Sequence, residues 1–159
     1  MIVHSVEEVI RACRIVVGGL IAGLVLFSGV ALAVAPLTPS PDPQITAAML
    51  VMVLVMGAGC AAGYRVVRRS VIAEMRSRLP ASAEGGDPAA LVTDCYRQLV
   101  IVRGGLTEGP GFLALMTYIV TGHVLALGAA GVAVILLGAN FPSADEIRRL
   151  ATAARAGSE

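Results

Sequence analysis

The chemistry that this 159-residue sequence suggests rests on a few charged side chains in apolar surroundings. Glu108 directly precedes an uncharged stretch, 109–139, and Arg103 lies shortly before Glu108. An isolated charge is costly in hydrocarbon, so such groups are usually paired, neutralised or in contact with water. Glu108 is therefore the first candidate functional residue. Three alternatives are open: it reaches water at a membrane interface, it pairs with an arginine (Arg103, Arg65 or Arg14), or it exchanges a proton or ion.

Pro110 is a further candidate because it stands between two glycines two residues after Glu108. A proline inside a helix removes the backbone hydrogen bond to the residue four positions earlier, here Leu106, so we expect a bend at this point. Arg103, Glu108 and Pro110 together form the candidate intramembrane functional set.

Residue sets typical of catalysis or metal binding are missing from the sequence. His4 and His123 are far apart, and Cys13, Cys60 and Cys95 share no short spacing with them or with one another. Zinc sites use closely spaced pairs such as CxxC or HxxxH, and nucleophilic catalysis needs Ser/His/Asp or Cys/His sets. The sequence predicts no catalytic residue, metal site or cofactor, and a protein that is not an enzyme.

Composition places the elements that carry these residues in a membrane. Hydrophobic residues make up 57% and charged residues 14% of the chain, whereas soluble domains carry about 25% charged residues. The mean hydropathy is +0.82. A net charge of +1 gives no overall attraction to nucleic acid. We expect an integral membrane protein with the lipid bilayer as its main solvent.

Two spans are evident in the first half. Residues 15–35 contain no charge, and at ~1.5 Å per residue they cross a hydrocarbon core of about 30 Å. Four prolines between 36 and 43 end this segment, and a second uncharged span covers 45–64. A cleaved signal peptide is the alternative for the first span, but its apolar stretch is too long for one.

The last apolar stretch, 109–139, would measure ~46 Å as one helix, which exceeds a bilayer core. Two spans, about 98–121 and 124–141, follow if the chain turns at Thr121-Gly122-His123. The positive-inside rule favours this solution over three spans, because four crossings keep every arginine on the cytoplasmic side or at its interface. Both termini are then cytoplasmic, and the protein is a multi-pass protein of the bacterial inner membrane.

The predicted fold is all-α: a polytopic four-helix bundle of two hairpins, forming a single membrane domain over 1–159 with a cytoplasmic linker at about 65–95. Short amphipathic helices are expected at both ends. Each follows a capping box, Ser5-Val6-Glu7-Glu8 or Ser143-Ala144-Asp145-Glu146. Their apolar residues are expected on the bilayer surface: Val6, Val9, Ile10, Ile147, Leu150 and Ala154.

Three GxxxG motifs predict close helix packing, since small residues let backbones approach in lipid. They are Gly19 with Gly23, Gly59 with Gly63, and Gly105 with Gly109. Packing within one chain is the main interpretation, and a dimerisation face is the alternative.

Arginines follow the second span directly. Arg65, Arg68 and Arg69 are expected at the lipid headgroups, where each contributes about 1 kcal/mol of attraction to anionic lipid. The predicted partners are therefore the bilayer, anionic lipid, and a second copy or another membrane protein, but not nucleic acid.

The stretch from Arg103 to Gly122, RGGLTEGPGFLALMTYIVTG, followed by Phe141-Pro142-Ser143, resembles the C-terminal half of an uncharacterised family of small bacterial four-span membrane proteins. A Glu-Gly step, an aromatic-containing span, a short turn and a Phe-Pro-Ser or Phe-Pro-Thr exit recur in that family. The resemblance covers about the last third of the chain and implies the topology but no activity.

A weaker local similarity is to the proteolipid c subunit of rotary ATPases, and it implies that Glu108 is an ion-binding carboxylate. This sequence departs from that pattern because Glu108 lies in the third span, toward the inner face, and the first span lacks a dense glycine ladder. The expected function is thus structural or regulatory, through packing against a partner. The alternative is an ion- or proton-coupling subunit, in which Glu108→Gln abolishes transport while folding is intact.

Overall fold

The computed structural model describes residues 6–35, 42–83 and 88–155, and over these ranges the chain is helical with no strand. Five helices follow one another: α1 (Val6–Val34), α2 (Pro43–Ala83), α3 (Pro88–Thr121), α4 (Val124–Ala139) and α5 (Ala144–Arg155). The expected all-α class is confirmed.

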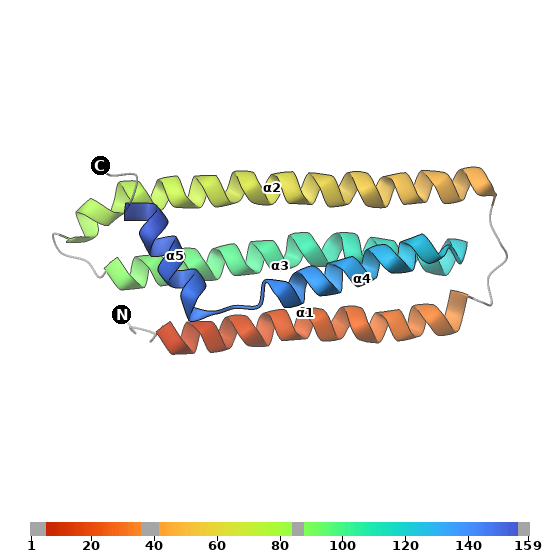
Figure 1. The fold of residues 1–159 in the computed structure, drawn as a ribbon, viewed down its shortest axis with the longest axis horizontal. Coiled ribbons are helices and arrows are strands. Elements are labelled where there is room, and N and C mark those ends of the chain that lie inside the picture. Colours follow the sequence, from red (N-terminus) through yellow and green to blue (C-terminus); the bar gives the residue numbers. More distant parts are fainter. Residues whose placement is uncertain (1–5, 36–41, 84–87, 156–159) are drawn as a thin grey trace.

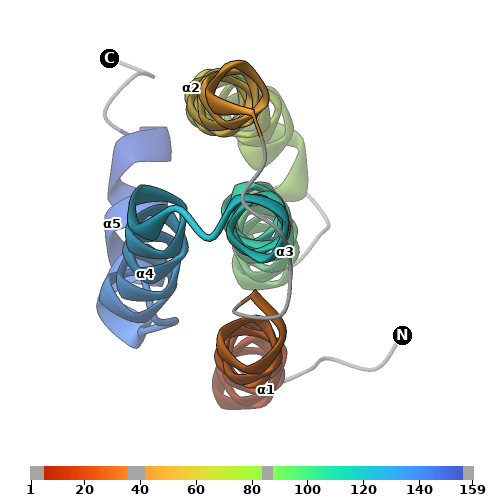
Figure 2. The same cartoon turned by 90° about the vertical axis from the view of Figure 1, so that its right-hand side faces the viewer.

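Helices α1 to α4 run alternately up and down the long axis, and α5 lies across one end, called the α5 end below (Figure 1). Seen along that axis, α3 is central: α1 and α2 lie on opposite sides of it and α4 lies beside it (Figure 2). Helix α3 packs against α1, α2 and α4, whereas α2 makes few contacts with α4. The chain is therefore organised around α3.

Three helices, α1, α2 and α3, are long and apolar enough to cross a membrane. The 16 residues of α4 extend ~24 Å, and α4 qualifies only together with α5, from which it is bent by 79°. Within the described ranges, length and composition thus give three candidate spans, or four when the bent pair is included. These long apolar helices support the membrane character expected from composition.

The expected turn after Thr121 is present. Gly122 has φ +63°, in the left-handed region that favours glycine, and its amide donates to the Tyr118 carbonyl at 2.7 Å. His123 is the N-cap of α4, since its Nδ1 accepts from the Leu125 amide at 3.3 Å. His123 therefore caps α4 directly after the predicted turn.

Of the two expected terminal helices, the C-terminal one is present as α5. No separate helix precedes the first span, because α1 is continuous from Val6. Val9 and Ile10 are buried, as are Ile147 and Leu150 of α5. These four residues belong to one hydrophobic cluster at the α5 end, so they need no bilayer surface to cover them. Val6, by contrast, is exposed. Ser5 of the first capping box and the side chain of Ala154 lie outside the described part.

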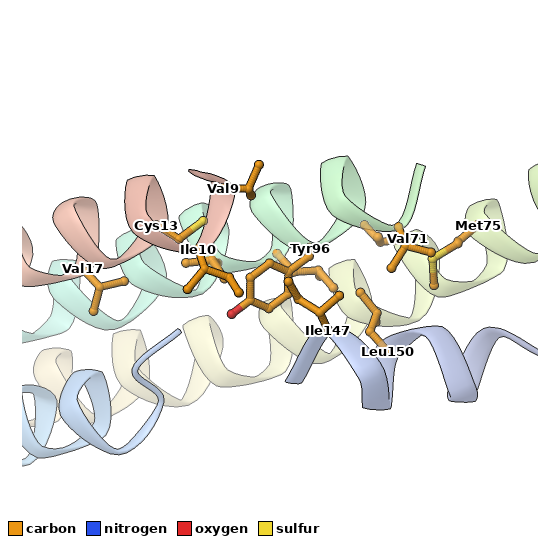
Figure 3. Packing of buried hydrophobic residues seen from close by; sticks show 12 residues of the cluster. Val9, Ile10, Cys13, Val17, Val71, Met75, Tyr96, Ile147 and Leu150 are labelled. Atoms are coloured by element: carbon orange, nitrogen blue, oxygen red, sulfur yellow. The ribbon is translucent and has the colours of Figure 1, made fainter. Parts of the chain in front are cut away.

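A hydrophobic cluster at the α5 end joins four helices. In Figure 3, Tyr96 of α3 lies between Ile10 and Cys13 of α1 on one side and Ile147 of α5 on the other. Met75 of α2 belongs to the same cluster. A second cluster, which includes the fully buried Leu24, Ala114 and Leu115, fills the seam between α1, α3 and α4 farther along the bundle.

The predicted linker at 65–95 is largely helical. Helix α2 continues to Ala83 and α3 begins at Pro88, so most of the predicted linker belongs to these two helices. Val71 and Met75 of α2 pack with Val92 and Tyr96 of α3. Packing of these residues stabilises α2 and α3 beyond their apolar spans. The length of an apolar span does not predict this extension.

Candidate functional site

A groove lies between α2 and α4, with α3 as its floor, and is called the α2–α4 groove here. It has a volume of about 960 Å³. It exists because α3 packs against both flanking helices while these make few contacts with each other. Its walls are mostly apolar: Val53, Leu54, Ala61, Leu106, Val132 and Leu136.

Three arginines of α2 line the end of this groove nearest the α5 end: Arg65, Arg68 and Arg69. Spacings of three and four residues put them on one face of the helix. All three are exposed, and among the described residues none forms an ion pair. The residues predicted to meet lipid headgroups thus border an apolar groove.

Arg103 lines the same end of the groove, but its charge is balanced by an ion pair. Its Nη1 lies 2.6 Å from Glu146 Oε1, and its Nη2 donates to the Asn140 carbonyl at 2.5 Å. The Arg103 side chain is 12% exposed. Pairing of Arg103 with Glu108, one of the alternatives above, is therefore not what the structure shows: its partner is Glu146 of α5.

Glu146 was expected to close the second capping box, but it is engaged elsewhere. The Tyr96 hydroxyl donates to Glu146 Oε2 at 3.3 Å and accepts from the Ser143 amide at 3.2 Å. The amide that a capping-box glutamate would satisfy is thus satisfied by a phenol. Helix α5 still begins at Ala144, directly after the predicted cap. Spacing along the chain could not reveal this, because Tyr96 is remote in sequence.

The segment between α4 and α5 is held from two helices. Arg14 of α1 donates through Nε to the Pro142 carbonyl at 3.1 Å, while Arg103 of α3 holds the Asn140 carbonyl. Both carbonyls lie at or after the end of α4, where they have no helical partner. These two arginines fix the direction in which α5 leaves the bundle.

Glu108 lies on the other side of α3, toward α1, and does not line the groove. A methyl group added to Gly23 would lie 3.9 Å from Glu108 Oε1 and 4.0 Å from the Phe112 ring. The carboxylate is partly exposed and has no hydrogen bond or ion pair within the described ranges. Pro110 lines the groove, and α3 continues through it as one helix.

The predicted packing glycines are mostly not at contacts. Around Gly19, Gly59, Gly63 and Gly105, an added Cβ would meet nothing within 4 Å. Gly23 lies near Glu108, and an added Cβ on Gly109 would lie 3.3 Å from Met56 Cε.

The tightest contacts involve two other glycines of α3, which the motif search missed. A Cβ on Gly104 would lie 2.8 Å from Leu20, and one on Gly111 would lie 3.0 Å from Ala133 and 3.1 Å from Leu24. Gly104 and Gly111 are two helical turns apart and share one face of α3. That seven-residue spacing is the only sequence pattern that links them.

Cys60 lines the groove, while Cys13 is buried and Cys95 is half-buried. All three thiols are free. Within the described part of the chain, His, Cys, Asp and Glu form no group suited to a metal ion.

Comparison of the chain with protein-family models, with curated proteins and with solved structures finds no match.

Proposed function

We propose that this protein is a multi-pass inner-membrane protein that acts by binding, in a structural or regulatory role, with the α2–α4 groove as its binding surface. In this proposal the chain crosses the bilayer four times, with α4 as the fourth span and α5 on the cytoplasmic side. The clustering of arginines near the α5 end supports that orientation, since basic residues are retained in the cytoplasm. The resemblance to small four-span membrane proteins agrees with it but adds no activity.

The groove is the observation that carries the proposal. Its volume of about 960 Å³ is at the upper end of the ~300–1,000 Å³ typical of ligand sites. In a bilayer there is little hydrophobic drive to close such a gap, so its walls keep their van der Waals contacts only if another molecule fills it. We therefore infer an occupant taken from within the membrane.

Cys60 provides a direct test because it lies in the groove wall. In a Cys95→Ser background, the rate of labelling by N-ethylmaleimide is measured in native membranes and again after exhaustive exchange into a short-chain detergent. We expect Cys60 to react several-fold faster once the occupant has been removed. The remaining thiol, Cys13, is 2% exposed and should stay unlabelled.

Position 62 is the matched control. Ala62 is exposed and outside the groove, only two residues further along α2, so Ala62→Cys in a Cys60→Ala background samples nearly the same depth. Its rate should change much less than that of Cys60. If both positions respond equally to detergent exchange, the groove has no occupant and the proposed function is wrong.

A further inference from the structure

The α2–α4 groove has two chemically different parts. Toward Val53 and Leu54 its walls are aliphatic, and at the other end it is bordered by Arg65, Arg68 and Arg69. Tyr64 lies at the boundary between the two parts, the position that phenols favour between hydrocarbon and water. A molecule that matches both parts has an apolar body and a polar, anionic head.

The length of the apolar part matches one leaflet of a bilayer. Val53 and Arg65 are 12 residues apart on one helix, or ~18 Å, and half of a bilayer core is about 15 Å. A partner helix that crosses the whole membrane would instead need a contact surface of about 30 Å. The arginines at the end of the groove favour an occupant that ends at the headgroup level.

The charge at the head of the groove is uncompensated. Arg103 is neutralised by Glu146, but Arg65, Arg68 and Arg69 form no ion pair among the described residues. The planar guanidinium fork suits phosphate oxygens. Zwitterionic headgroups add a cation for which this end offers no free carboxylate, because Glu146 is already engaged by Arg103 and Tyr96.

From this match of length, polarity and charge, we infer that the α2–α4 groove is a specific site for one anionic glycerophospholipid of the inner leaflet. An acyl chain lies along Val53, Ala61 and Val132, and the phosphate lies at Arg65, Arg68 and Arg69. The inference rests on the proposed function of the groove and names its occupant.

Lipid retention by the full-length chain tests this inference. The protein is reconstituted in vesicles of equal parts phosphatidylglycerol and phosphatidylcholine, extracted in mild detergent, and analysed by native mass spectrometry. Because the three unpaired arginines attract an anionic headgroup, we expect one bound phosphatidylglycerol, enriched at least about tenfold over phosphatidylcholine. The triple variant Arg65→Gln, Arg68→Gln, Arg69→Gln should lose this enrichment.

A second triple variant removes the same charge elsewhere: Arg11→Gln, Arg97→Gln and Arg148→Gln. These arginines are exposed and do not line the groove, so the enrichment should persist. Circular dichroism confirms that both variants fold. Equal loss of phosphatidylglycerol in the two variants would mean that the lipid responds to overall charge, and would overturn a specific site.

Seating of the acyl chain has its own test. Ala61 lines the groove whereas Ala62 does not, so Ala61→Phe should reduce retention several-fold and Ala62→Phe should leave it unchanged. If Ala61→Phe has no effect, the arginines bind phosphate at the surface only and the inference is wrong.

The tests separate the two proposals. A second copy of the chain retained in place of lipid, or retention without headgroup preference while Cys60 stays protected, would overturn the lipid assignment and leave the binding groove standing. Loss of Cys60 protection would remove both.

Discussion

At the scale of single residues, the glycines on one face of α3 determine how closely the neighbouring helices pack. Gly111 meets Leu24 of α1 and Ala133 of α4, while Gly105 faces open space. The GxxxG spacing selected Gly105 and Gly109, because a local motif shows which residues are small but not which face is buried. Identifying Gly111 requires knowing the neighbours of α3.

Gly111→Ala is expected to destabilise the bundle by about 1–3 kcal/mol, since the new methyl would lie 3.0 Å from Ala133 Cβ and force a shift. Gly105→Ala meets no atom within 4 Å and should be neutral or stabilising by up to about 1 kcal/mol, because alanine favours a helix. Thermal unfolding in detergent, followed by circular dichroism because the chain has no Trp, compares the two. Equal changes would contradict the packing described at Gly111.

Charged residues illustrate what sequence could and could not supply. Arg65, Arg68 and Arg69 were predicted at the headgroups because they directly follow an uncharged span, and they border the groove. The groove itself was not predictable, since it depends on α2 and α4 making few contacts. The partner of Arg103 was also missed, because Glu146 was assigned to its own helix by a motif that considers only neighbours in sequence.

At the scale of elements, α5 is attached to the bundle by both apolar and polar contacts. Ile147 and Leu150 are 8% and 7% exposed, and Glu146 pairs with Arg103. This ion pair is worth more than a surface pair, because its partial burial reduces solvent screening. A second pair, Asp145 with Arg148, is almost fully exposed and lies within α5.

A double-mutant cycle with Arg103→Gln and Glu146→Gln should give a coupling energy of about 1 kcal/mol or more in unfolding. The matched cycle with Arg148→Gln and Asp145→Asn should give about zero, since that pair is 3.9 Å apart with side chains 83% and 78% exposed. Chemical or thermal unfolding of each set in one detergent provides the measurement. Coupling of equal size in both cycles would refute the distinction between them.

The helices themselves were largely predictable, and their ends were not. Uncharged length and the glycine at 122 placed the turn between α3 and α4 correctly, since a single helix over 109–139 is too long for a bilayer. Apolar length sets only a lower limit on a helix. Helices α1, α2 and α3 all extend beyond the predicted spans at the α5 end, where contacts among Val9, Met75 and Tyr96 stabilise them.

At the scale of the whole molecule, α1 begins and α5 lies at the same end of the bundle (Figure 1). The end of α1, the start of α2 and the turn between α3 and α4 lie at the other end. In the proposed topology the α5 end is cytoplasmic. The described arginines, from Arg11 to Arg149, then lie on the cytoplasmic side or at the cytoplasmic membrane interface, as the positive-inside rule requires.

Reporter fusions test that topology. A cytoplasmic reporter fused after Glu159 should be active, and a periplasmic reporter at the same point inactive. Insertion of the same reporters after Asp42, directly before α2, should give the opposite pattern, because α2 begins at the far end of the proposed spans. A periplasmic signal after Glu159 would mean an odd number of crossings and would contradict α4 as the fourth span.

Because α3 is central, the order of membrane insertion has a physical consequence. Helices α1 and α2 leave the ribosome first, yet they make almost no contact with each other. Association of α1 with α2 alone therefore provides almost no packing energy before α3 is inserted. Assembly begins only when α3 arrives between them, and a chain truncated before residue 88 should remain as two separate helices, exposed to membrane proteases.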